Sequence, residues 1–231
     1  MRQALDRERL RGVYDRVARR YNFQHSFLTA RSDQRGRELL VRKTVSVGSR
    51  VLDAGAGTGS TALLAAKRTG PSGVVVLYDM SDGMLAVAKS RLEDAGVGDR
   101  IEIQTGDISS LPFEDGSFDV ALSTYSMCPL FAPKQGALEL YRVVRPGGLM
   151  GVAHSAEPRS RWVRWLGDRV EDVVWRFPWI SLGCRSVSVL PALKEVGARV
   201  VFQKQIGVPL WPFAVFVVEK PPRATSRRLH S

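Results

Sequence analysis

The sequence predicts an α/β fold with a doubly wound, mostly parallel sheet that closes with an antiparallel hairpin. From Arg50 onward, short β-rich runs alternate with helical spacings of apolar residues, as in consecutive strand–helix units. The run Val74–Tyr78 is typical of a strand buried on both faces of a parallel sheet. The last two β-rich runs, Arg199–Gln205 and Phe213–Glu219, are joined by a loop too short for a crossover helix, so they cannot both be parallel to the rest.

The remaining elements follow in order along the chain. Two helices are expected first, over Leu5–Tyr21 and Asp33–Val45; in the first, apolar residues recur at intervals of three and four. Five strands precede the hairpin, over Arg50–Ala54, Val74–Tyr78, Ile101–Thr105, Phe118–Ser123 and Leu149–His154. Further helices are expected over Ser60–Arg68, from the N-cap Ser81 to Ala95, over Lys134–Val144 and over Val187–Val196.

The length of 231 residues suits one domain with an insertion, since domains run to about 100–200 residues. We expect an N-terminal helical cap over 1–45, a sheet domain over 46–220 and a basic tail over 221–231. Residues 156–186 are rich in Trp and Arg and form the insertion. A lid over the site, a helix packed on the sheet and a contact with a membrane surface are the three interpretations of this insertion.

Composition narrows the class of protein. A hydrophobic fraction of 44% is that of a globular chain and excludes wholesale disorder or a fibrous repeat. The two cysteines, Cys128 and Cys184, lack zinc-like spacing, and no segment has the pattern of a signal peptide or the length of a membrane span. We therefore expect a cytoplasmic protein with free thiols and no metal. The net charge of +11 indicates either a solvated basic surface or a nucleic-acid partner.

The most informative segment is the glycine run Gly55-Ala56-Gly57-Thr58-Gly59, which follows a strand and precedes a helix. Glycines at this place let the backbone approach a ligand, and the first turn of the helix offers free N–H groups. The Lys of a phosphate-binding P-loop is missing, and the spacing departs from a dinucleotide fingerprint. Asp53 lies inside the turn, where its carboxylate would repel a pyrophosphate but suit a ligand with a cationic amino group.

This loop resembles motif I of the class I S-adenosylmethionine-dependent methyltransferases, and the resemblance extends over essentially the whole chain. Further motifs match in order at the strand ends: Asp79-Met80, Gly106-Asp107-Ile108, Ser123-Thr124-Tyr125 and the turn Arg142–Gly148. The resemblance implies a Rossmann-like sheet of seven strands with S-adenosyl-L-methionine as cofactor. It implies cofactor-binding roles for Asp53, Gly55 and Gly57 at the methionine moiety, Asp79 at the ribose, Met80, Asp107 and Ile108 at the adenine, and Ser123 beside the methyl-transfer cleft.

The amino-terminal segment Val13–Asn22 resembles the first helix of the ubiquinone/menaquinone-biosynthesis C-methyltransferases and their small-molecule relatives (methyltransferase type 11), although Asn22 replaces an Asp. In that group the second aromatic residue closes over the cofactor, a role that would fall to Tyr21. The resemblance implies a small-molecule or lipid-like, quinone-type acceptor. If the acceptor must lose a proton, the candidate bases are His154, at the end of the fifth strand, and Tyr125, at the end of the fourth.

Three functions remain open at this point. The resemblance favours methyl transfer to a small or lipid-like acceptor. An RNA or protein methyltransferase is an alternative suggested by the basic charge, although the Asn/Asp-Pro-Pro-Tyr/Phe motif of nucleic-acid amino-methylation is missing. The third is a non-catalytic module that binds S-adenosylmethionine. Whether His154 is chemical or structural, which acceptor atom is methylated and what oligomer forms are all left undecided by the sequence.

Overall fold

The structure is a computed structural model that describes residues 7–18, 32–156, 162, 169, 187–208 and 211–222. Tyr21, most of the predicted insertion 156–186 and most of the predicted tail 221–231 lie outside the described residues. Among the described residues, no helix is both long and apolar enough to cross a membrane.

In the described part of the chain, seven strands form one sheet in the order β3-β2-β1-β4-β5-β7-β6. The strands β1 to β5 are parallel to one another, and β7 runs antiparallel to both β5 and β6. The predicted fold class is therefore confirmed, with the closing hairpin at one edge. The strands are β1 (Arg50–Ala54), β2 (Val74–Asp79), β3 (Ile101–Thr105), β4 (Phe118–Thr124), β5 (Val144–Ser155), β6 (Arg199–Val208) and β7 (Trp211–Glu219).

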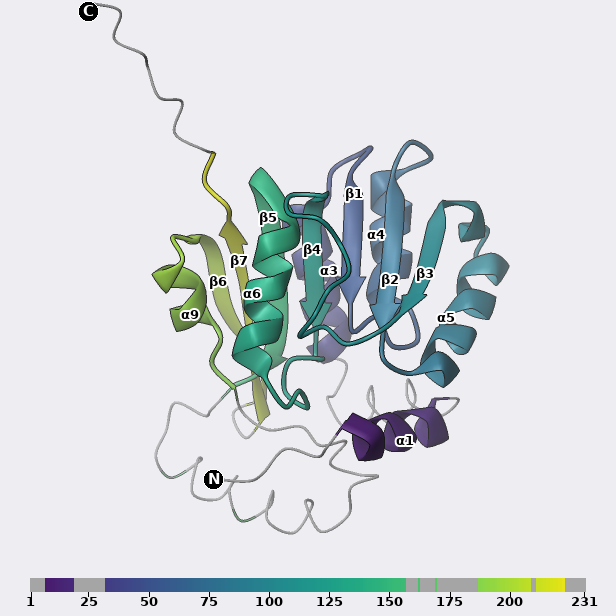
Figure 1. Ribbon diagram of the computed structural model, residues 1–231, viewed down its shortest axis with the longest axis horizontal. Helices are drawn as coiled ribbons and strands as arrows, with labels where there is room; N and C mark the ends of the chain where they lie inside the picture. The colour runs from purple at the N-terminus through teal and green to yellow at the C-terminus, as the bar shows by residue number, and fades with distance from the viewer. Residues whose placement is uncertain are drawn as a thin grey trace, which may run out of the picture.

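Helices cover both faces of this sheet (Figure 1). One face carries α3 (Ser32–Thr44), α4 (Ser60–Thr69) and α5 (Asp82–Asp94), whose apolar residues share a core cluster. The opposite face carries α6 (Pro133–Val143) and α9 (Leu190–Glu195) over a second cluster. A 3₁₀ turn, η1 (Gly98–Arg100), leads into β3.

The first helix, α1 (Arg7–Val17), lies across the end of the sheet at which the parallel strands finish (Figure 1). It contacts α5, and its small apolar cluster is separate from the two cores on the sheet faces. By contrast, α3 packs on the sheet beside α4, although the sequence assigned it to the cap. Of the described helices in the predicted cap 1–45, α1 is thus the one that caps the carboxyl end of the sheet.

The strand β1 shows how the core positions a polar group. Leu52 and Ala54 face the α6 side and Val51 faces the α3–α4 side, as the twofold alternation of a strand requires. Asp53 follows the same alternation and therefore points, like Val51, toward α3 and α4. Its side chain is fully buried, so the fold places a carboxylate where an apolar residue would be expected.

Candidate functional site

A cleft opens at the carboxyl ends of β1, β2, β3 and β4, the place where open α/β sheets bind ligands. Its volume is about 560 Å³, part of which is open to solvent. Seven residues that the sequence singled out line the cleft: Gly55, Gly57, Asp79, Met80, Asp107, Ile108 and Tyr125. The structure therefore brings together side chains from four separate strand ends.

The glycine loop forms the floor of the cleft between β1 and α4. Gly55 and Gly57 have positive φ angles of 72° and 52°, which other residues adopt only with strain. A Cβ atom on Gly55 would lie 2.2 Å from the Cβ of Ser126, so a side chain has no room there. A Cβ atom on Gly57 would meet nothing within 4 Å, because this glycine borders the open cleft.

Asp79 is held by the backbone on both sides. One carboxylate oxygen accepts a hydrogen bond of 2.9 Å from the N–H of Gly57, and the other accepts one of 2.9 Å from the N–H of Ser81. Burial raises the pKa of Asp79, whereas the N–H groups of Ser81, Gly57 and Met80 act in the opposite direction. The group is fixed in place and still borders the cleft, so it can accept hydrogen bonds from a ligand.

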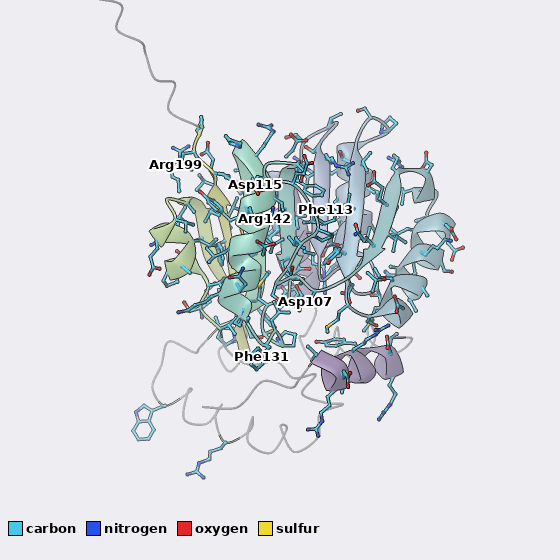
Figure 2. The ribbon with its side chains drawn as sticks, in the orientation of Figure 1. Asp107, Phe113, Asp115, Phe131, Arg142 and Arg199 are labelled. Carbon is cyan, nitrogen blue, oxygen red and sulfur yellow. The ribbon has the colours of Figure 1, made fainter. Side chains whose placement is uncertain are left out.

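Asp107 occupies the equivalent place after β3 (Figure 2). One of its carboxylate oxygens accepts hydrogen bonds from the backbone N–H and the hydroxyl of Ser109, at 2.8 and 2.7 Å. These bonds close a tight turn that orients the side chain. Ile108, the next residue, also lines the cleft and packs into the core on the α6 side.

Asp53 lies behind the glycine loop and is not part of the cleft lining. Neither of its carboxylate oxygens has a hydrogen-bond partner among the described residues, and the side chain is fully buried. Burial raises the pKa of Asp53 to about 7, while the positive charge of Arg37 and the N–H of Ala62 act in the opposite direction. A buried carboxyl group without partners fits a site that is completed by a cationic ligand.

Tyr125 lines the cleft but turns its hydroxyl away into α3. The hydroxyl donates to the carbonyl oxygen of Asp33 at 3.2 Å, and the Arg37 guanidinium lies 5.0 Å from the ring centre. Burial raises the pKa of Tyr125 further above its ordinary value. A phenol that donates to a carbonyl and resists ionisation is poorly suited to accept a proton, so this geometry does not favour the predicted role as a base.

His154 does not join the cleft. Its side chain is buried and lines a different hollow, together with Phe216, Lys194 and Gln203. The Nδ1 atom lies 2.8 Å from the carbonyl oxygen of Ser155 and therefore carries the proton of the neutral ring. Burial lowers the pKa of His154, and the Ser155 carbonyl partly offsets this effect.

Ser123 is fully buried and is not part of the cleft lining, but it contacts a residue that is. Its hydroxyl lies 2.5 Å from that of Ser126, which donates at 3.1 Å to the carbonyl oxygen of Ala54. Ser126 itself lines the cleft, although no pattern in the sequence singled it out. Gly106 and Thr124 also line the cleft and belong to the motifs at the strand ends, although they were given no role there. The lining residues that sequence reasoning missed are Leu10, Tyr14, Met84, Pro129 and Leu130.

Two of these missed residues come from α1. Leu10 and Tyr14 are four residues apart, so they lie on one face of the helix and meet the cleft together. The helical spacing in the sequence already indicated this apolar face. It was used to predict the helix but not the cleft that the face contacts.

Comparison with known proteins indicates a methyltransferase, as the motifs in the sequence do. Residues 51–148 match the family Methyltransf_25, described as a methyltransferase domain. The ubiquinone/menaquinone biosynthesis C-methyltransferase UbiE of Geobacter sulfurreducens is 34% identical over 155 residues, which are 67% of this chain and 60% of that protein. A demethylmenaquinone methyltransferase of Clavibacter sepedonicus is 38% identical over 155 residues, covering 66% of this chain and 60% of the relative. The chain thus matches about three fifths of the length of these relatives.

Solved structures share the fold at lower identity. The [4+2]-cyclase SpnF has a TM-score of 0.66 and 20% identity, with 81% of this chain and 80% of that chain covered. A geranyl diphosphate methyltransferase in complex with SAM has a TM-score of 0.63 and 17% identity, with coverages of 80% and 84%. These similarities establish the architecture and leave the chemistry to the residues of the site.

The sheet order, the glycine loop and the acids at the strand ends define the class I S-adenosylmethionine-dependent methyltransferases. Residues 51–148 match a methyltransferase domain of this kind, and the chain is similar to the ubiquinone/menaquinone-biosynthesis C-methyltransferases over about two thirds of its own length. S-adenosyl-L-methionine is the cofactor of the family. The unpartnered carboxylate of Asp53 and the open space above Gly57 both fit it.

Proposed function

We propose that this chain is an enzyme that transfers a methyl group from S-adenosylmethionine to a small or lipid-like acceptor of quinone type. The observation that carries the proposal is the convergence of Gly57, Asp79 and Asp107 on one cleft at the carboxyl end of the sheet. Relatives named for ubiquinone, menaquinone and demethylmenaquinone methylation support the choice of acceptor class.

Bound S-adenosylmethionine supplies an activated methyl group on a sulfonium centre. In the proposed complex, Asp79 accepts hydrogen bonds from the ribose hydroxyls, and Asp107 accepts one from the adenine amino group. Met80 and Ile108 pack on the faces of the adenine. Asp53 balances the charge of the methionine amino group from behind the glycine loop, directly or through water.

The rest of the cleft suits an apolar acceptor. Leu10 and Tyr14 of α1 and Pro129 and Leu130 after β4 contribute apolar surface to its lining. An apolar wall excludes water, and it holds the acceptor carbon in line with the methyl group. We infer that most of the rate enhancement comes from this positioning.

We propose that Tyr125 and His154, the two candidate bases, hold neighbouring parts of the structure in place. Tyr125 anchors the segment after β4 to α3 through its bond to Asp33, and this anchor places Ser126 against the glycine loop. His154 fills a buried position beside Phe216, at a ring-centre distance of 5.9 Å. The proton released by the acceptor then passes to solvent or to an ionised oxygen of the acceptor itself.

We also propose that α1 and its surroundings face an anionic membrane from the cytoplasmic side. Phe131 is 67% exposed and directly follows Leu130, which lines the cleft (Figure 2). Arg9 and Arg16 are exposed on α1. An exposed aromatic residue next to the cleft lining, together with exposed arginines on a helix that lines the same cleft, is typical of contact with a lipid interface, where a prenylated acceptor resides.

The domain organisation follows from the same proposal. Residues 1–45 form an N-terminal segment whose helix α1 covers the cleft, residues 46–220 form the cofactor-binding domain with its insertion 156–186, and residues 221–231 form a basic tail.

The first experiment incubates the protein with methyl-labelled S-adenosylmethionine and a reduced demethylmenaquinone in anionic vesicles. We expect label in the organic phase and an equal amount of S-adenosylhomocysteine. Vesicles of phosphatidylcholine alone provide the control for the charge requirement, and Phe131→Ala tests the aromatic contact.

A parallel assay with a cell extract as the source of acceptors distinguishes a quinone acceptor from RNA, from protein and from a non-catalytic binding module. Label in RNA or protein, with none in the organic phase, would replace the quinone acceptor with a macromolecular one. Binding of S-adenosylmethionine without label in any fraction would favour a non-catalytic binding module.

A further inference from the structure

The helix α1 forms one wall of the cofactor cleft, and its apolar contacts with the described part of the chain are few. Leu10 and Tyr14 line the cleft, and Ala18 packs against Met84 of α5. This small cluster does not belong to the core on either face of the sheet. Polar contacts must therefore contribute much of the energy that keeps α1 in place.

The principal polar contact comes from Asp15. Its Oδ1 atom accepts a hydrogen bond of 2.5 Å from the hydroxyl of Ser81 and one of 3.2 Å from the N–H of Gly83. Both donors belong to the start of α5, where free N–H groups and the helix dipole favour a negative charge. A carboxylate on α1 thus acts as an additional cap for a different helix. Arg11 pairs with Asp82 and, at 3.9 Å, with Asp15, in exposed positions.

The same contact reaches the cofactor site through Ser81. The Ser81 hydroxyl accepts from the N–H of Met84 at 3.1 Å, as the N-cap of α5. Its backbone N–H donates to Asp79, whose other oxygen binds the N–H of Gly57. A continuous series of hydrogen bonds therefore joins Asp15 on α1 to the glycine loop.

We propose that Asp15 is a positioning residue of the cofactor site, which fastens α1 over the cleft and, through Ser81, fixes the turn that presents Asp79. Release of the cofactor then requires the bonds of Asp15 to open, so this residue controls the dissociation rate. The proposal rests on the proposed function only in that the cleft binds S-adenosylmethionine. It does not depend on the acceptor.

The test compares Asp15→Ala, Asp15→Asn and Arg11→Ala by stopped-flow and calorimetric binding of S-adenosylhomocysteine. For Asp15→Ala we expect the dissociation rate and the Kd to rise about tenfold, as for the loss of one hydrogen bond to a charged group. Asp15→Asn keeps an oxygen that can accept from both donors, so it should restore most of the affinity. Arg11→Ala removes the exposed ion pairs of Arg11 with Asp82 and Asp15 but leaves the hydrogen bonds from Asp15 to α5 intact, so it should change both constants much less than Asp15→Ala.

A double-mutant cycle that combines Asp15→Ala with Ser81→Ala tests whether Asp15 acts on the cofactor site through Ser81. If Asp15 acts through Ser81, the effects of the two substitutions should be far from additive. Hydrogen exchange on the unmodified protein provides a second readout, and the amides of α1 should gain protection when S-adenosylhomocysteine binds.

Two results would overturn the proposal. One is an Asp15→Ala protein that unfolds more easily but keeps the dissociation rate of the parent, since this indicates a purely structural contact. The other is unchanged exchange of α1 on ligand binding. Failure of the parent protein to bind either S-adenosylmethionine or S-adenosylhomocysteine would instead refute the cofactor assignment itself.

Discussion

Replacement of Asp53 by Asn should make the folded protein less sensitive to pH and weaken its binding of S-adenosylmethionine. The pKa of Asp53 rises from 3.8 to about 7 on folding because the carboxyl group is fully buried. An acid with a raised pKa binds more protons in the folded state than in the unfolded state between these two values. The free energy of unfolding therefore falls as pH increases from about 4 to 7 and then levels off.

The size of this effect follows from the two pKa values. Between pH 5 and pH 8, the ionisation of Asp53 should lower the free energy of unfolding by about 3 kcal/mol. The cationic amino group of the ligand favours the ionised carboxylate, so binding should strengthen as Asp53 loses its proton. With a pKa near 7 in the free protein, affinity should rise about eightfold between pH 6 and pH 7.5.

Urea unfolding of the unsubstituted protein and of Asp53→Asn at several pH values measures the pH dependence of stability. Calorimetric titration of both proteins with S-adenosylmethionine measures the pH dependence of affinity. Asp53→Asn should lack both pH dependences. Taking the difference between the two proteins cancels the titration of the ligand and of other groups such as His154. Parallel stability profiles, or an affinity that falls with pH in the unsubstituted protein, would refute the reasoning about Asp53.

Three further substitutions test other parts of the site. Asp79→Asn loses one of two backbone hydrogen bonds and should weaken cofactor binding by about 10- to 100-fold in calorimetry. His154→Ala should cost about 1–3 kcal/mol in urea unfolding and leave kcat unchanged, and a loss of turnover would restore the histidine as a base. Gly36→Ala places a Cβ atom 2.2 Å from the Tyr125 hydroxyl and should destabilise the fold by about 1–3 kcal/mol, whereas Gly12→Ala, with nothing within 4 Å, should not.

Local sequence signals were sufficient for the first four strands. The strands β1 and β3 have the bounds that were predicted for them, and Ser81 caps α5 as expected. The predicted helix over Val187–Val196 begins later, at Leu190, because Pro191 belongs in the first turn of a helix.

The larger difference between the predicted and the observed strands is in β5, and long-range pairing explains it. The predicted turn before this strand is part of it, starting at Val144, which pairs with Phe118. The N–H of Gly147 donates to the carbonyl of Lys220, and the N–H of Lys220 donates to the carbonyl of Gly148. This contact joins segments more than 70 residues apart, so no local pattern contained it.

The site shows the same division between local and tertiary signals. Asp79 and Asp107 both line the cleft, and a motif at a strand end was enough to predict that position. His154 was assigned to the cleft because it ends a strand, but alternation along β5 turns it to the opposite face from Ala153, toward Phe216. The contribution of α1 was missed because helical spacing predicts an amphipathic face without its partner.

Two residues around the cleft, Asp53 and Tyr125, break local rules. Asp53 is a carboxylate in a core position without a hydrogen-bond partner, and Tyr125 has a positive φ of 61° although it is not glycine. Each feature costs stability in the ligand-free protein. A cationic ligand would relieve the first, and α3 holds the second through Asp33 and Arg37. Saturating S-adenosylmethionine should therefore stabilise the protein more at pH 7.5 than at pH 6, and this difference should vanish in Asp53→Asn.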